Sequence, residues 1–461
     1  MEGGNAETES SRNLLGNYRM TNDTIERTVR MRVVGGLRGL CSAFRLPPFA
    51  LLALLIALLG LGVLTGCNKS PPAKFRLNMQ GRDVDDFVIS GGESADELKE
   101  KKARIKGRQD IVNVLYAMFG TPDEPYVFAE SGLDLAKIKL AAGASTNDEH
   151  GEIRGLYRRH CVHCHGVSGD GAGPTAAFLT PFPRDYRKGI YKFKATQRSA
   201  RPRPDDLATV LREGIPGTAM PSFLLLPADE IEALVEYVRY LSMRGEVESA
   251  LAFQVYDQEG ELAMDRDSLV SDYLQPVAEV WGSAKDSLIE PASRPSIDTP
   301  EKLAASIKAG GELFRGGKAQ CMKCHGPTAL GDGSEERLFD DWNKDKKFAE
   351  LAKQIAQAKD SAERSHLKRV KASWLLPEQE LHPRNLRLGI YHGGRSPADL
   401  YRRIHAGING TPMPGAGPAP GNPGTLKPEE IWQIVDYVRS LPYEFMSEQE
   451  VGETTVHKSQ L

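Results

Sequence analysis

The chain has 461 residues, of which 40% are hydrophobic and 26% charged, and its formal net charge is -3. This composition is typical of a soluble globular protein with two or three domains. Because 62 Asp and Glu outnumber 59 Lys and Arg, the chain lacks the basic surplus of a nucleic-acid-binding protein, and six cysteines at this length are too few for a disulfide scaffold.

An uncharged segment, residues 46–68, is the first feature along the chain. Its apolar centre, residues 49–64, is short for a membrane span but typical of a signal peptide, and arginines precede it. It ends in Leu64-Thr65-Gly66-Cys67, which resembles the lipobox of bacterial lipoproteins. We predict a lipoprotein-type signal peptide at residues 31–66 and a lipid on the thiol of Cys67. An ordinary transmembrane anchor is the alternative. Both place the rest of the chain on the extracytoplasmic face of a bacterial cell envelope.

Residues 1–30 have an acidic start, with Glu2, Glu7 and Glu9, whereas a signal peptide begins with basic residues. We therefore predict that they are an upstream extension and that translation begins at Met31. Residues 67–145 then contain a polar tether, 67–81, followed by a charged helix over 94–119.

Two C-x-x-C-H motifs follow, Cys161-Val162-His163-Cys164-His165 and Cys321-Met322-Lys323-Cys324-His325. This is the attachment signature of c-type haem. Cysteines three positions apart lie on one side of a helical turn, where both thiols can form thioethers to haem, and the adjacent histidine can bind iron. A zinc site made of both C-x-x-C pairs and a redox-active dithiol are alternatives, but both leave His165 and His325 without a role. We predict two covalently bound haem c groups.

The sequence after each motif is repeated. Residues 183–191 and 383–391 both begin Pro-Arg and end Gly-Ile-Tyr, and residues 214–221 and 407–414 both read Gly-Ile-x-Gly-Thr-x-Met-Pro. Each copy closes with an amphipathic helix, which has apolar residues at Ile231, Leu234, Val235, Val238 and Leu241 and at Ile431, Ile434, Val435, Val438 and Leu441. The chain therefore contains two copies of one module.

This order of motifs resembles the class I cytochrome c family, and more closely its bacterial dihaem group. The resemblance implies an all-α fold with two tandem cytochrome c domains, module 1 at residues 146–245 and module 2 at residues 301–446. It also implies that the first and last helices of each module cross, with Gly155 and Tyr157 against Tyr237 and with Phe314 against Tyr437. A linker, 246–300, is predicted to contain a helix over 268–287.

The resemblance also implies that Met220 and Met413 are the distal iron ligands. Each follows Gly-Thr-x and precedes Pro in a segment without helical periodicity. In module 2 His392 and His405 are the alternative ligands, and His163 is expected to face away from the iron. His/Met ligation favours ferrous iron and leaves no open position for a substrate.

Three further residues are predicted to surround the haems. By resemblance, the carbonyl of Pro174 accepts a hydrogen bond from His165, whereas module 2 has no matching proline. Arg184 and Arg384 either pair with haem propionates or are solvated.

The modules differ by an insertion of about 40 residues in module 2, at 335–378, whose pattern fits one or two surface helices. It is either a solvated decoration or a docking element for a redox partner. Residues 447–461 are predicted to be a flexible tail.

The sequence predicts a membrane-tethered electron carrier, not an enzyme. Its expected partners are redox proteins, namely a quinol-oxidising complex and a terminal oxidase or another reductase, without nucleic acid or a small-molecule substrate. A permanent cytochrome subunit of such a complex is one alternative. A dihaem peroxidase is another, but it needs an open iron position, and the methionine segment is intact in both modules.

Overall fold

The computed structural model describes residues 73–147, 153–258, 261–335, 337–339 and 346–458. The chain divides into two units at residue 71, and all described residues belong to the second unit, 72–461. The predicted upstream extension, signal peptide and Cys67 lie outside the described residues. Within those residues, no helix has the length and apolar character needed to cross a membrane.

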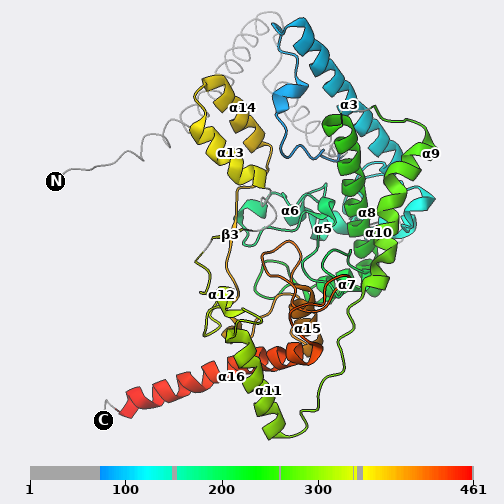
Figure 1. Cartoon of the computed structure of the whole chain (residues 1–461). Helices are drawn as coiled ribbons and strands as arrows, with labels where there is room; N and C mark the ends of the chain where they lie inside the picture. The colour runs from blue at the N-terminus through cyan, green and yellow to red at the C-terminus, as the bar shows by residue number, and fades with distance from the viewer. Residues whose placement is uncertain (1–72, 148–152, 259–260, 336, 340–345, 459–461) are drawn as a thin grey trace, which may run out of the picture. The chain divides into compact units, whose positions relative to one another are not determined.

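The structure is mostly helical, as predicted (Figure 1). The α-helices are α3 (Ala95–Phe119), α4 (Leu135–Ala141), α5 (Leu156–His160), α6 (Val162–His165), α7 (Pro204–Glu213), α8 (Ala228–Ala252), α9 (Arg266–Leu269), α10 (Gln275–Gly282), α11 (Pro300–Arg315), α12 (Met322–His325), α13 (Lys346–Gln357), α14 (Ser361–Ala372), α15 (Pro397–Ala406) and α16 (Pro428–Lys458). Strands β1 (Thr146–Asn147) and β2 (Ile153–Arg154) form one antiparallel pair, and β3 (Leu338–Phe339) and β4 (Glu380–Leu381) form another.

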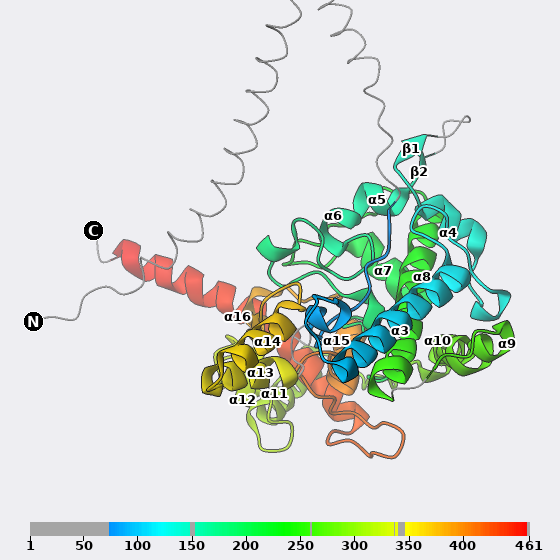
Figure 2. The same ribbon diagram turned by 90° about the horizontal axis from the view of Figure 1, so that it is seen from above.

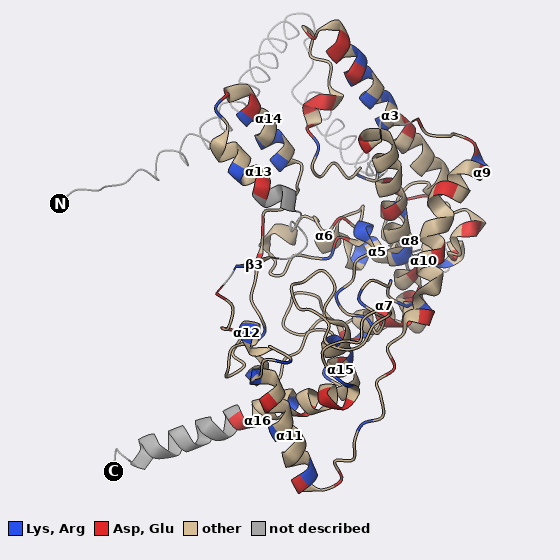
Figure 3. Ribbon diagram, viewed as in Figure 1, with Lys and Arg blue, Asp and Glu red and all other residues tan. Residues whose placement is uncertain are grey.

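Helix α8 is the centre of module 1, and α3, α4, α5 and α7 all pack against it. Figures 1 and 2 both show α3 beside α8. Charged residues of both signs occur along α3 (Figure 3). One face of its C-terminal half is buried, and the hydroxyl of Tyr240 on α8 donates to the carbonyl of Phe119 at 2.5 Å. The predicted helix over 94–119 is therefore confirmed, with Ser94 as its N-cap.

The predicted helix crossing in module 1 is correct for one of its two residues. The rings of Tyr157 and Tyr237 are 4.8 Å apart, which brings α5 onto α8. Gly155, however, faces the backbone of Ala144. Its φ of +71° at the N-cap of α5 directs the side-chain position toward Ala144 and Ser145, so the predicted contact of Gly155 with Tyr237 is not seen there.

In module 2, α11 crosses α16 as predicted. Gly310 lies against the carbonyl of Gln433 with no room for a side chain, and the rings of Phe314 and Tyr437 are 5.3 Å apart. Helix α16 continues to Lys458, so residues 447–458 of the predicted tail are helical, while the flexibility of the tail stays a prediction. The chain after Pro442 is rich in Glu and Gln, which are good helix formers, and contains no further proline.

The linker is helical where the sequence predicted it. Helix α9, a π-helical turn η6 (Val270–Leu274), α10 and a 3-10 turn η7 (Ser283–Ser287) follow one another without a break. Trp281 on α10 is buried, and its indole N–H donates to Glu246 of α8 at 2.8 Å. The linker is therefore packed against module 1.

Residues 73–82, here called the strap, are fixed to module 1. The backbone N–H of Arg76 donates to the hydroxyl of Ser168 at 2.7 Å, and that of Asn78 donates to Glu248. Two aromatic contacts add to these bonds, because Phe75 lies 6.1 Å from Tyr240 and under the guanidinium of Arg244. The predicted tether over 67–81 was therefore wrong from residue 73 onward, since these bonds hold it on the protein surface.

The insertion in module 2 forms two helices, α13 and α14, which meet the N-terminal region. The guanidinium of Arg369 and the ring of His366, both on α14, contact the carboxylate of Asp83, which is 1% exposed. Just beyond α14, the Ser373 hydroxyl accepts from the backbone N–H of Gly81, and Leu376 packs on Ala176 of module 1. Part of the insertion surface is therefore used for contacts within the chain.

We expect Asp83→Asn to loosen α14. Burial by itself raises the pKa of Asp83, but hydrogen bonds from Arg369, the Asp85 N–H and His366 outweigh this and lower it. Since the folded pKa is the lower one, the stabilisation is complete above the unfolded value of ~3.9 and is lost as the pH falls through the folded value. Arg369 is partly exposed, so we expect a modest effect of about 1.4 kcal/mol.

Hydrogen exchange of the α14 amides near neutral pH measures this effect. The variant should exchange about tenfold faster than the natural chain. Glu100→Gln removes an exposed carboxylate of α3 and is the control, for which no change is expected. Equal α14 exchange in Asp83→Asn and the natural chain would show that the contact with α14 is not stabilising.

Candidate functional site

Each C-x-x-C-H motif forms a single helical turn. In module 1 the backbone N–H groups of Cys164 and His165 donate to the carbonyl of Cys161 at 3.2 and 2.9 Å. The same two bonds, with the same lengths, join Cys324 and His325 to Cys321. All four cysteines are free thiols. The turn places both thiols and the imidazole of one motif on the same short segment, as the sequence predicted.

The C-x-x-C pairs do not build a zinc site. Among the described residues, which include all four cysteines of these pairs, no group of three or more His, Cys, Asp or Glu is arranged to hold a metal ion. Burial raises the pKa of Cys161 to about 12 and that of Cys321 to about 11, so both thiols are protonated at neutral pH. A structural zinc site needs four ligands brought together at one point, so the zinc alternative is not supported.

Both proximal histidines are held in the same way. The Nδ1 of His165 lies 3.1 Å from the carbonyl oxygen of Arg184, and that of His325 lies 3.3 Å from the carbonyl oxygen of Arg384. A carbonyl can only accept, so Nδ1 carries the proton and Nε2 keeps its lone pair. Burial lowers the pKa of His165 to about 4 and also lowers that of His325. Both imidazoles are therefore neutral and can bind a metal through Nε2.

The prediction that Pro174 holds His165 was wrong. The N–H groups of Gly173 and Thr175 donate to the carbonyls of Cys164 and His163, each at 3.0 Å. These bonds place Pro174 beside the attachment turn, where it is exposed. The acceptor for His165 is Arg184 instead, and module 2, which lacks the proline, uses the matching Arg384.

The two methionine segments have the same backbone structure. In the Met220 loop (residues 214–221) the Thr218 hydroxyl donates to the carbonyl of Ile215 at 2.8 Å and accepts from the N–H of Met220 at 3.1 Å. In the Met413 loop (residues 407–414) Thr411 makes the corresponding bonds to Ile408 and Met413 at 2.9 and 3.2 Å. This turn explains the threonine two positions before each methionine. It fixes the backbone of both predicted distal ligands, which are partly buried.

The other histidines considered in the sequence analysis make contacts of their own. His163 is exposed, as expected. His405 is buried on α15, where its ring stacks on Tyr401 at 5.9 Å and lies against Gly417. His392 lies against Gly217 and Phe193, which belong to module 1. His392 is therefore directed toward the other module.

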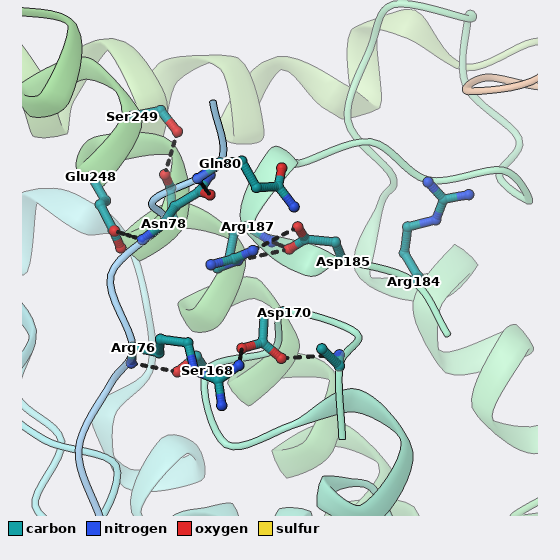
Figure 4. A network of polar contacts seen from close by, with 12 residues as sticks. Arg76, Asn78, Gln80, Ser168, Asp170, Arg184, Asp185, Arg187, Glu248 and Ser249 are labelled. Atoms are coloured by element: carbon teal, nitrogen blue, oxygen red, sulfur yellow. Dashed lines mark hydrogen bonds and ion pairs between the residues drawn. The ribbon is translucent and has the colours of Figure 1, made fainter. Parts of the chain in front are cut away.

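A network of buried charges lies beside the attachment loop of module 1, residues 166–174, which follows the attachment turn (Figure 4). Arg187 and Asp185 form a two-point ion pair with distances of 2.9 Å, and both side chains are 2% exposed. Burial by itself would lower the pKa of Arg187, but the charge and hydrogen bonds of Asp185 raise it. Arg244 and Glu248 form a second buried pair, and the buried carboxylate of Asp170 lies 3.6 Å from the largely exposed guanidinium of Arg76 in the strap. The sequence analysis did not identify these residues.

The proximal side also differs between the modules. The ring of Tyr186 stacks on His165 at 4.6 Å, whereas Leu386 holds the matching position in module 2. The side chain of Arg184 lies apart from the charge network in Figure 4. Arg384 has a buried Nε without a hydrogen-bond partner among the described groups, and burial lowers its pKa. The predicted pairing of these two arginines with haem propionates stays a prediction.

Family comparisons match both modules. Residues 148–238 match the family described as cytochrome c oxidase, cbb3-type, subunit III, and residues 307–442 match the cytochrome c family. The chain carries two cytochrome c domains. These are modules 1 and 2, and the expected all-α architecture with two tandem cytochrome c domains is confirmed.

Two other comparisons are less informative. No curated protein matches the chain. One solved structure, the Kuenenia stuttgartiensis reducing HAO-like protein complex, is similar over 62% of this chain and 94% of that chain, with 25% sequence identity and a TM-score of 0.39.

The residues of both cytochrome c modules fit haem c. Each offers two free thiols, one neutral imidazole with an available Nε2, and one methionine on a fixed loop. Cytochrome c domains imply covalent haem, and one attachment turn in each of two domains is consistent with two haems. When bound, haem c supplies an iron that cycles between the ferrous and ferric states.

Proposed function

We propose that the chain is a membrane-tethered, extracytoplasmic dihaem cytochrome c that transfers single electrons between respiratory proteins. The observation that supports this most directly is that the same ligand arrangement, with a carbonyl-bonded histidine and a threonine-braced methionine, occurs in both modules. An iron with two protein ligands is suited to electron transfer and not to substrate binding.

In each module, other residues of the chain fix the positions of the predicted histidine and methionine ligands. The carbonyls of Arg184 and Arg384 fix the imidazoles, and the hydroxyls of Thr218 and Thr411 fix the methionine backbones. Ligands that move little between oxidation states keep the reorganisation energy of electron transfer small. The apolar core of module 1 keeps water from His165, whereas His325 is only partly buried.

A redox titration of the purified protein with absorption spectra tests this function. We expect two haems per chain and a Met-to-iron charge-transfer band from both. One haem, or no such band, would contradict the site assignment. Rapid turnover of peroxide, or a high-spin haem in the resting protein, would instead support a peroxidase.

The membrane anchor is proposed from the sequence alone. Cys67→Ala should move the protein from the membrane fraction to the soluble fraction, because its lipid would be lost. Cys41→Ala, within the predicted signal peptide, is the matched control and should leave the protein in the membrane. Retention of Cys67→Ala in the membrane would favour the transmembrane alternative.

The partners are proposed to be a quinol-oxidising complex and a terminal oxidase or other reductase. Tethering raises the effective concentration of the cytochrome near such membrane proteins. Mild detergent extraction separates the carrier from a permanent subunit of a complex. A carrier should elute alone, whereas co-elution at a fixed ratio with a larger complex would favour the subunit.

A further inference from the structure

Each methionine loop is contacted by an arginine of the other module. The guanidinium of Arg198, in module 1, donates to the carbonyl of Met413 at 2.6 Å through Nη1 and to the carbonyl of Thr411 at 2.8 Å through Nη2. In the other direction, the guanidinium of Arg384, in module 2, lies against Gly217 of the Met220 loop. The contacts between the modules therefore involve the loops that carry both predicted distal ligands.

The contact of Arg198 is built from both sides. Gly407 begins the Met413 loop with a φ of +72°, and a side chain there would place its Cβ only 2.6 Å from Arg198 Nη1. On the module 1 side, residues 194–198, here called the Arg198 segment, are held by two hydrogen bonds. The N–H of Gln197 donates to the carbonyl of Ser287 at 2.9 Å, and the ammonium of Lys194 donates to the hydroxyl of Thr196. The arginine is therefore presented by an ordered segment to a loop that has room for it.

The sequence of module 1 contains extra residues at this place. Sixteen positions separate Tyr191 from Leu207, whereas nine separate the matching Tyr391 and Leu400 in module 2. The additional residues in module 1 include the Arg198 segment. Module 2 has no corresponding segment that could contact the Met220 loop. Arg384 and His392 lie against that loop instead.

The two bonds of Arg198 complete the support of Met413. Within module 2, the Met413 N–H is held by Thr411 and the Met413 carbonyl accepts from the N–H of Ile408 at 3.2 Å. Arg198 adds charged donors to the Met413 and Thr411 carbonyls from outside the module. A planar guanidinium can bind both carbonyls at once, which a lysine ammonium cannot do with the same geometry.

We propose that Arg198 is a positioning residue for the distal ligand of the opposite module, so that binding of Met413 to the second iron depends on module 1. This inference rests on the proposed function, since it takes Met413 as a distal ligand. It adds that the two haem sites are coupled through a defined contact.

Displacement of methionine by imidazole from the ferric full-length protein tests the proposal, with the charge-transfer band as the readout. In Arg198→Gln, the imidazole concentration that displaces methionine should fall about tenfold at one haem and stay unchanged at the other. In Arg198→Lys, the imidazole concentration that displaces methionine should fall about threefold at the same haem. Arg395→Gln, which removes an exposed arginine of module 2, should match the natural protein at both haems.

Met413→Ala identifies the affected haem. It should remove the part of the band that is weakened in Arg198→Gln. If Met413→Ala leaves the whole band intact, the ligand assignment fails, and the inference fails with it. If the assignment holds but Arg198→Gln behaves as the natural protein, or weakens both haems equally, the positioning role is refuted while the proposed function stands.

If Arg198→Gln does not accumulate with two haems, Arg198→Lys decides alone. It keeps the positive charge and loses only the two-point geometry. A threefold change confined to the Met413 haem then supports the proposal, and unchanged imidazole affinity overturns it.

Discussion

Serine in place of Cys161 and Cys164 should leave a folded chain with one haem, whereas serine in place of Cys321 and Cys324 should unfold module 2. The reason is the difference between the apolar cores. Among the described residues, the core around module 1 contains 32 buried hydrophobic residues, including Ile111 on α3 and Trp281 on α10 from outside the module. The core of module 2 contains 16. A smaller core depends more on the apolar surface that haem covers.

The local burial supports the same conclusion. Cys161 and His165 are buried, whereas the matching Cys321 and His325 are partly exposed; Cys164 and Cys324 are partly exposed in both modules. The two double variants serve as controls for each other, because each removes one haem. Haem content per chain and limited proteolysis measure the result. We expect one haem in both variants and rapid cleavage within residues 301–446 only when Cys321 and Cys324 are replaced. Equal protease resistance of the two would contradict this account.

Asp185→Asn should destabilise module 1 by about 3–5 kcal/mol, since it leaves the buried charge of Arg187 without its partner. Both side chains are 2% exposed, so water cannot replace the lost carboxylate. Asparagine can still accept the backbone N–H of Arg187, as Asn385 does from Arg387 in module 2 at 3.0 Å. The expected loss therefore comes from the charge and not from the turn.

Arg387→Gln is the matched control for this prediction. Arg387 occupies the same place in module 2, but it donates to the carbonyl of Thr328, and its acidic partner at 3.8 Å, Glu444, is 47% exposed. We expect less than about 1 kcal/mol from its removal. Urea unfolding followed by far-ultraviolet circular dichroism measures both variants. A change below 1 kcal/mol in Asp185→Asn would show that the ion pair does not stabilise the module.

Features that depend on short-range sequence pattern were predictable. The attachment turns, the helices at 94–119 and 268–287 and the paired helices of the insertion all follow from spacing and periodicity along the chain. The two methionine loops were found because the Gly-Ile-x-Gly-Thr-x-Met-Pro sequence occurs twice. The structure adds the reason for the threonine, whose hydroxyl bonds within the loop.

Features that depend on backbone acceptors or on distant residues were not predictable. The carbonyl of Arg184 holds His165, and a carbonyl is present at every residue, so no side chain marks its role. Arg198 and Met413 are 215 positions apart, and neither residue's neighbours indicate the other. The buried pair of Arg187 and Asp185 has the composition of an ordinary polar turn. The folded structure is needed to distinguish these buried charges from solvated ones.

The strap also limits where module 1 can be if Cys67 carries a lipid. Ala73 is fixed to Asp123 at 2.7 Å, and its neighbours are fixed to the attachment loop and α8. Six residue steps separate Cys67 from Ala73, which span at most about 20 Å when fully extended. Ala73, where the strap joins module 1, would then lie within about 20 Å of the bilayer surface. Electron donors and acceptors that meet module 1 would have to present their own redox sites at that height above the membrane.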